Sequence, residues 1–171
     1  VIARLHAVGD APGRFAFLAP GTDGDTPLRR RFALTGEWYA FAAADGFRSP
    51  RVERALAWLE DHWPTTGSET VLCWGDSRIG NVMYDGFDPV AVLDWEMAGI
   101  GPRELDLGWL VFAHRVFQTL AETFERPGLP DVLTEADVRT TYADLTGVEV
   151  GDLRDLLGRH RVGAGQLGDG L

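Results

Sequence analysis

The sequence predicts an α+β fold that is mainly helical, with a small β-hairpin region carrying a group of polar residues. Apolar residues recur at helical spacing over 49–63 and 104–126. Three short apolar runs that predict strands lie between these helices: 71–73, which is typical of a buried strand, 82–84 and 90–93. Asp85-Gly86 is a two-residue turn signal between the second and third runs, so these two are expected to form the hairpin.

The first part of the chain has a less regular pattern. Residues 1–8 are helical in pattern and are stopped by Gly9. Residues 10–34 contain several glycines and prolines, which predicts an irregular, exposed segment, with the run Arg29-Arg30-Arg31 as a solvated face. Residues 36–45 predict a helix, and its large aromatic side chains, such as Trp38 and Phe41, are expected to pack in the core.

The remaining helices have clearer boundaries. Ser49 is a good N-cap and Pro50 suits the first position of a helix, whose Val52, Leu56, Leu59 and Trp63 are expected in the core. The helix over 104–126 carries a broad apolar face from Leu107 to Leu120, widened by Trp109 and Phe112, and is expected to be central. Thr134 and Asp137 predict a capped helix over 134–145.

The end of the chain differs from the rest. Residues 152–157 could start one more helix, whereas 158–171 are rich in glycine and poor in apolar anchors. We therefore expect one domain over 1–157, followed by a disordered or aberrant tail over 158–171.

Composition narrows the class of function. The formal net charge of −10 argues against a nucleic-acid partner, because phosphates require a basic face. No stretch approaches the roughly 20 apolar residues of a membrane span. The single Cys73 excludes an internal disulfide, fits a reducing cytoplasm, and is expected in the core because it lies in an apolar run.

Polar residues lie where the predicted strands end. Asp76 and Asn81 belong to the loop between the first two strands, and Asp94 follows the third. A hairpin turning at Asp85-Gly86 brings Asn81 and Asp94 close together, and two hard oxygen ligands in a cleft suit Mg²⁺. Asp76 is then available to accept the proton of a substrate hydroxyl. This is the layout of a phosphoryl-transfer centre.

Two stretches, Trp74–Asn81 and Leu93–Glu96, resemble the aminoglycoside phosphotransferase family, and in particular its acyl-CoA-dehydrogenase-associated and actinobacterial branch. The resemblance covers roughly residues 50–150. It implies the C-terminal lobe of a protein-kinase-like fold, with Asp76 as the catalytic residue and Asn81 and Asp94 as magnesium ligands. Arg78 either meets the phosphates of the nucleotide or steadies the loop, and it can equally be a solvated arginine. Glu96 is either a further acidic ligand or a surface residue.

The same resemblance assigns supporting roles. Asp106, in the block Gly101–Asp106, is expected to brace the catalytic loop from the start of the following helix. The family usually has a histidine at the position of Trp74, where it packs rather than reacts. Trp74 is therefore expected to pack against the region after Asp94.

The implied reaction is transfer of the γ-phosphoryl group from Mg²⁺-bound ATP, or another nucleoside triphosphate, to a hydroxyl of a small molecule in the cytoplasm. Kinase-like enzymes hold the triphosphate with a lysine and a glycine-rich or equivalent loop on a separate N-terminal lobe. All 16 basic residues here are arginines and no such loop is visible. The chain is therefore expected to be a C-terminal lobe without its nucleotide lobe, inactive by itself.

Two alternatives belong to other classes. Gly75-Asp76-Ser77 matches the core of the GDS-type esterases, with Ser77 as nucleophile, although no Asp-x-x-His follows and the tripeptide lies in mid-chain. A non-catalytic remnant or binding module is the other alternative. His6 and His114 are expected to be packed helix residues rather than bases.

Overall fold

The computed structural model describes residues 1–19, 23–64, 69–151 and 153. The expected helix start at 152–157, apart from Leu153, and the expected tail at 158–171 lie outside the described residues. The elements are, in order, α1 (Ile2–His6), α2 (Ala11–Arg14), a 3₁₀ turn (Ala16–Leu18), α3 (Pro27–Ala44), α4 (Pro50–Asp61), β1 (Thr70–Cys73), a second 3₁₀ turn (Ile79–Asn81), β2 (Val82–Asp85), β3 (Asp88–Val92), β4 (Gly99–Pro102), α5 (Glu104–Thr123) and α6 (Glu135–Thr146).

The described strands form two separate antiparallel pairs, which confirms the mainly helical α+β prediction. β2 and β3 make the expected hairpin around Asp85 and Gly86, with Val82 opposite Val92. β1 pairs instead with β4, where Leu72 lies opposite Ile100. β4 was not predicted, because its sequence Gly-Ile-Gly-Pro consists mostly of residues that are depleted in strands. This pairing places the start of α5 directly beside the loop that follows β1.

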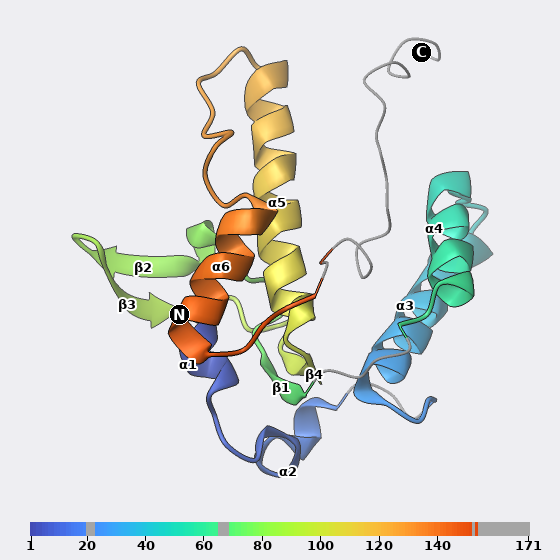
Figure 1. Cartoon of the computed structure of the whole chain (residues 1–171). Helices are drawn as coiled ribbons and strands as arrows, with labels where there is room; N and C mark the ends of the chain where they lie inside the picture. Colours follow the sequence, from blue (N-terminus) through green and yellow to red (C-terminus); the bar gives the residue numbers. More distant parts are fainter. Residues whose placement is uncertain (20–22, 65–68, 152, 154–171) are drawn as a thin grey trace.

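The main core lies between α5 and α6, which run side by side in the centre of Figure 1. Leu107 and Val111 of α5 pack there with Val138 and Tyr142 of α6, together with Val150 and Leu153. The second half of α5 does not follow the prediction: Phe117 and Leu120, expected on its buried face, are exposed. His114 is half-buried, and its ring Nε2 lies 2.9 Å from the Leu129 carbonyl oxygen. Within the described residues, no helix has the length and apolar character needed to cross a bilayer.

The prediction of an irregular segment over 10–34 was wrong. α3 already begins at Pro27, because the Thr26 hydroxyl accepts the N–H of Arg29 and proline occupies the first helical position. The helix continues through Gly36. The arginine run is not simply a solvated face either, since Arg29 pairs with Glu60 at 2.6 Å and stacks on the Trp63 ring.

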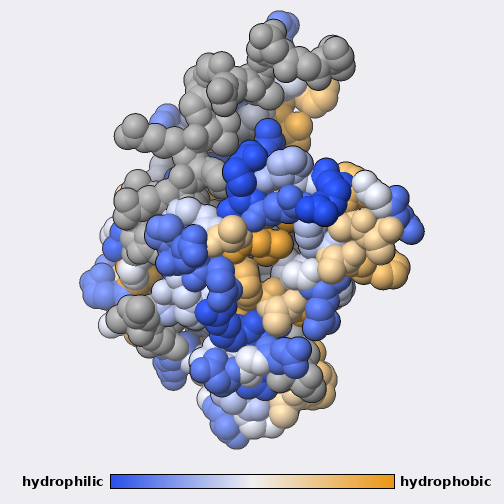
Figure 2. All heavy atoms as spheres, turned by 90° about the vertical axis from the view of Figure 1, so that its right-hand side faces the viewer, coloured by the Kyte–Doolittle hydropathy of each residue, from blue (hydrophilic) through white to orange (hydrophobic). Residues whose placement is uncertain are grey.

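Side-chain hydrogen bonds link α3 to α4, α3 also contacts β4, and both helices lie apart from α5 and α6 in Figure 1. The expected core packing of this region was wrong: Trp38 and Phe41 are 67% and 81% exposed, and none of the described side chains of α3 or α4 is fully buried. The apolar residues of α3 are spread around the helix rather than gathered on one face, so one neighbouring helix cannot cover them. Seen from the α3–α4 side, the surface carries an apolar hollow bordered by hydrophilic residues (Figure 2).

Candidate active site

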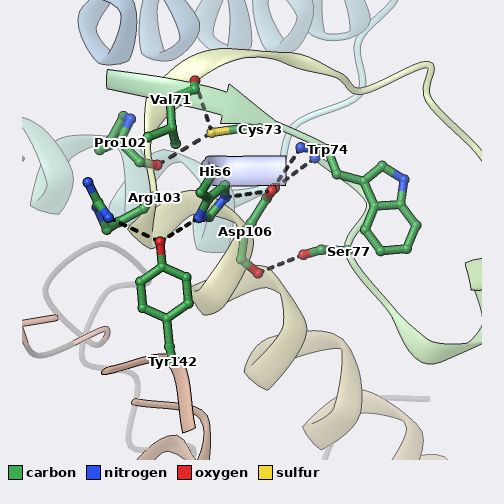
Figure 3. Close-up of polar contacts among 10 residues, drawn as sticks. His6, Val71, Cys73, Trp74, Ser77, Pro102, Arg103, Asp106 and Tyr142 are labelled. Atoms are coloured by element: carbon green, nitrogen blue, oxygen red, sulfur yellow. Dashed lines mark hydrogen bonds and ion pairs between the residues drawn. The ribbon is translucent and has the colours of Figure 1, made fainter. Parts of the chain in front are cut away.

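The loop that follows β1 is fixed by one buried carboxylate at the start of α5. Asp106 is fully buried, and its two oxygens accept the backbone N–H groups of Trp74 and Gly75, each at 2.8 Å. The hydroxyl of Ser77 donates to the Asp106 carbonyl at 2.6 Å (Figure 3). The expected bracing role of Asp106 is therefore confirmed, because three residues of the loop, Trp74, Gly75 and Ser77, are tied to one residue of α5.

Asp106 itself is held from behind by residues far away in the sequence. Nε2 of His6 lies 3.2 Å from Asp106 Oδ2, and Nδ1 of the same ring lies 2.9 Å from the Tyr142 hydroxyl (Figure 3). Arg103 donates to that hydroxyl at 3.1 Å. His6 is thus a buried and hydrogen-bonded helix residue, as expected. No local signal marks Tyr142 or Arg103, since their partners are 34 to 136 residues away.

The Asp76 carboxylate lies at the centre of the loop and accepts three side-chain hydrogen bonds. Its Oδ2 accepts Arg78 Nε at 2.8 Å and Asn81 Nδ2 at 2.7 Å. Its Oδ1 accepts the indole N–H of Trp109 at 2.7 Å. Partial burial by itself raises the pKa of Asp76, but the hydrogen bonds from Arg78, Trp109 and Asn81 outweigh it and leave the pKa below its usual range. Asp76 is therefore ionised at neutral pH.

Asp94 follows β3 in an uncommon backbone conformation. Its φ of +62° lies in the left-handed region, which few residues other than glycine adopt. Trp74 supports this position, because its indole N–H points to the carbonyl oxygens of Leu93 at 2.8 Å and Asp94 at 3.1 Å. Trp74 is only 2% exposed, and its ring lies 6.3 Å from that of Trp95. The expectation that Trp74 packs against the region after Asp94 is confirmed.

Three carboxylates converge beside the loop. Asp76, Asp94 and Glu96 each present one oxygen within 4.8 Å of the others. Arg78 lies between two of them, with one nitrogen 2.8 Å from Asp76 and another 3.6 Å from Asp94. Carboxylate oxygens are the ligands that Mg²⁺ prefers, so the donor set fits this ion.

Asn81 joins this group through its backbone and its side chain. The hairpin brings it beside the end of β3, where Leu93 donates its N–H to the Asn81 carbonyl at 2.9 Å. Its side-chain nitrogen is occupied by the carboxylate and the carbonyl of Asp76. The amide oxygen of Asn81 is therefore the atom available as a metal ligand, and this role stays a prediction.

A second group of possible ligands, His6, Cys73 and Asp106, also has atoms within 4.8 Å of one another. His6 and Asp106 are already engaged in bracing the loop. Cys73 is fully buried, as expected, and its burial, followed by the nearby charge of Asp106, raises the pKa of its thiol far above the usual range. A protonated thiol is a poor metal ligand, so this group is structural.

Gly75 and Ser77 limit the conformation and the chemistry of the loop that follows β1. Gly75 has φ of +92°, and a Cβ there would collide with the carbonyl of Met97, to which Arg31 of α3 donates at 3.1 Å. The segment 94–97 therefore lies directly against the loop that follows β1. Ser77 is fully buried and its hydroxyl is bound to Asp106. Because it is not presented to solvent, the structure does not support the esterase alternative.

Comparison with known proteins agrees with this geometry. Residues 1–138 match the model of the phosphotransferase enzyme family. A crystal structure from Ralstonia eutropha JMP134, named as an aminoglycoside phosphotransferase, superposes with a TM-score of 0.67 at 26% identity. The superposition covers 92% of this chain and 48% of that chain.

Two curated relatives are similar in sequence. Acyl-CoA dehydrogenase family member 10 of Mus musculus is 30% identical over 117 residues, which are 67% of this chain and 10% of the mouse protein. Ethanolamine kinase 2 of Homo sapiens is 36% identical over 58 residues, which are 33% of this chain and 15% of the human protein. The chain therefore spans a small part of these relatives and about half of the similar solved structure.

Proposed function

We propose that this chain, which belongs to the phosphotransferase enzyme family, carries the catalytic loop of a kinase-like enzyme that acts on a small-molecule hydroxyl. The observation that carries this proposal is the convergence of the Asp76, Asp94 and Glu96 carboxylates beside one braced loop. The proposed reaction transfers the γ-phosphoryl group of ATP, or of another nucleoside triphosphate, to the acceptor.

Asp76 is proposed as the residue that receives the acceptor hydroxyl. It is ionised at neutral pH, and its orientation is fixed by three donors. As the hydroxyl oxygen forms its bond to phosphorus, the hydroxyl proton passes to the carboxylate and the nucleoside diphosphate leaves. A positioned acid or base of this kind contributes roughly 10²- to 10⁴-fold to the rate.

Asn81 and Asp94 are proposed to hold Mg²⁺, with Glu96 as a further carboxylate in reach. When bound, the ion neutralises charge on the phosphate oxygens. Arg78 bridges Asp76 and Asp94 and so offsets the repulsion between two carboxylates. Because Arg78 is only partly buried, it can also meet a phosphate of the nucleotide.

The acceptor is proposed only as a hydroxyl compound. The names of two similar proteins contain ethanolamine and aminoglycoside, so these compounds are the first acceptors to be tested. Simple sugars and alcohols complete the panel.

The test combines turnover with metal binding. The complete product of the gene that encodes this chain is assayed for nucleoside diphosphate release with the acceptor panel, beside the 171-residue chain. Asp76→Asn is expected to remove transfer, while Asp88→Asn on the exposed hairpin is the matched control. Mn²⁺ titration of Asp94→Asn, followed by electron paramagnetic resonance, is expected to show weakened binding. Transfer that survives Asp76→Asn would contradict the proposed role of Asp76, whereas no transfer by the complete product to any acceptor would favour a binding module.

A further inference from the structure

Trp109 lies three residues after Asp106 on α5, so both side chains leave the helix on the same side. Asp106 holds the backbone of the catalytic loop, whereas Trp109 reaches the side chain of Asp76 itself, with 2.7 Å between its indole nitrogen and Oδ1. The sequence pattern had placed Trp109 on a widened apolar face. One helix therefore fixes both the path of the loop and the carboxylate at its centre.

A count of lone pairs shows what this contact does. An ionised carboxylate offers about four acceptor positions, two on each oxygen. Arg78 and Asn81 fill both positions of Asp76 Oδ2. Trp109 fills one position of Oδ1. One position is left, on an oxygen of a side chain that is 11% exposed.

We propose that Trp109 is a positioning residue whose indole N–H fixes the rotation of the Asp76 carboxylate and leaves one lone pair of Oδ1 for the acceptor hydroxyl. This inference rests on the proposed role of Asp76. Without the indole, Oδ1 keeps both acceptor positions open and the carboxylate is held from one side only. A hydroxyl can then bind in an orientation that is not in line with the phosphoryl group.

An indole suits this task for two reasons. It is a donor only and carries no charge, so it cannot take the proton that Asp76 is to receive. Its ring is also restrained by packing, because it is half-buried and lies against Phe112 with ring centroids 5.5 Å apart. Removing the N–H while keeping an aromatic ring therefore separates positioning from packing.

The first experiment observes the hydrogen bond without any need for turnover. The indole N–H resonances of the six tryptophans are recorded at neutral pH in the ¹⁵N-labelled chain, with Trp109 assigned through the backbone of α5. In Asp76→Asn, the Trp109 indole proton is expected to shift upfield and to exchange faster with solvent. Trp38, exposed on α3, serves as the internal control. An unchanged Trp109 resonance in Asp76→Asn would overturn the inference.

The second experiment measures the consequence in the complete gene product. Trp109→Phe is expected to lower kcat roughly 10- to 100-fold, the range for a hydrogen bond to a charged group, while KM for the nucleotide stays unchanged. Trp38→Phe is expected to leave both constants unchanged. If Asp76→Asn abolishes transfer and Trp109→Phe does not slow it, the positioning role is wrong and the proposed function stands. If Asp76→Asn has no effect, the proposed function is wrong. If Trp109→Phe does not fold, the comparison of the Trp109 indole resonance between the unmodified chain and Asp76→Asn decides whether the positioning role is correct.

Discussion

Replacement of Trp74 tests how the loop that follows β1 is held to the end of β3 and to Asp94. Its side chain is almost wholly buried, and its indole N–H is shared between the carbonyls of Leu93 and Asp94. Emptying a large buried aromatic site costs about 3–5 kcal/mol, so Trp74→Ala is expected to lower the free energy of unfolding by this amount. Trp74→Phe keeps most of the volume and loses the N–H, so it is expected to cost about 1 kcal/mol for bonding, plus a smaller packing loss.

The assay is urea denaturation followed by far-ultraviolet circular dichroism, which does not depend on tryptophan emission. A lower midpoint with an unchanged m-value reports a loss of stability alone. Trp38→Ala, at a position 67% exposed, is the control and is expected to change stability by less than about 0.5 kcal/mol. A Trp74→Ala variant that is no less stable than Trp38→Ala would contradict this role of Trp74.

Three further predictions concern the same loop. Gly75→Ala is expected to lower the free energy of unfolding by more than about 1 kcal/mol in urea denaturation, because φ is +92° and the added Cβ meets the Met97 carbonyl. An unchanged midpoint would contradict this prediction. Ser77→Ala should cost about 1 kcal/mol by the same measurement, and neither form should hydrolyse p-nitrophenyl esters; hydrolysis lost with Ser77 would revive the esterase alternative. Burial, followed by the charge of Asp106, raises the pKa of Cys73, so its thiol should stay protonated at pH 8 and react slowly with iodoacetamide unless urea is added.

The elements predicted well are those with local signals. The hairpin turn and the caps at Ser49 and Thr134 each act within a few residues, and all three are present, although the turn lies at Gly86-Phe87, one residue after the expected Asp85-Gly86. The brace from Asp106 and the packing of Trp74 were also anticipated, through a resemblance that fixes their spacing to the loop. The start of α3 carried the same kind of signal in Thr26 and Pro27, but the neighbouring glycines and prolines concealed it.

What the sequence could not show depends on distant partners. β4 forms because β1, far upstream in the sequence, offers it a pairing edge, which outweighs the poor strand propensity of its glycines. Trp109 reads as an apolar core residue, and only the approach of a loop 33 residues upstream turns its N–H into a donor to Asp76. Trp38 and Phe41 show the opposite error, since aromatic residues on a helix were expected to find a core and did not.

The contacts of the site explain why the spacing of a few residues is enough to identify this loop in the sequence. Asp106 can bind the backbone of Trp74 and Gly75 only if β4 returns beside β1 and delivers α5 at that point. The collision that a Cβ at Gly75 would cause with Met97 likewise fixes the path of the segment after Asp94. Both contacts involve backbone atoms of the loop, so they constrain the spacing of residues along the chain more than the identity of the loop's side chains. A tryptophan can therefore stand at position 74 without disturbing the carboxylates. An inserted residue between Asp94 and Asp106, by contrast, would displace the segment that follows β3 from the loop that follows β1.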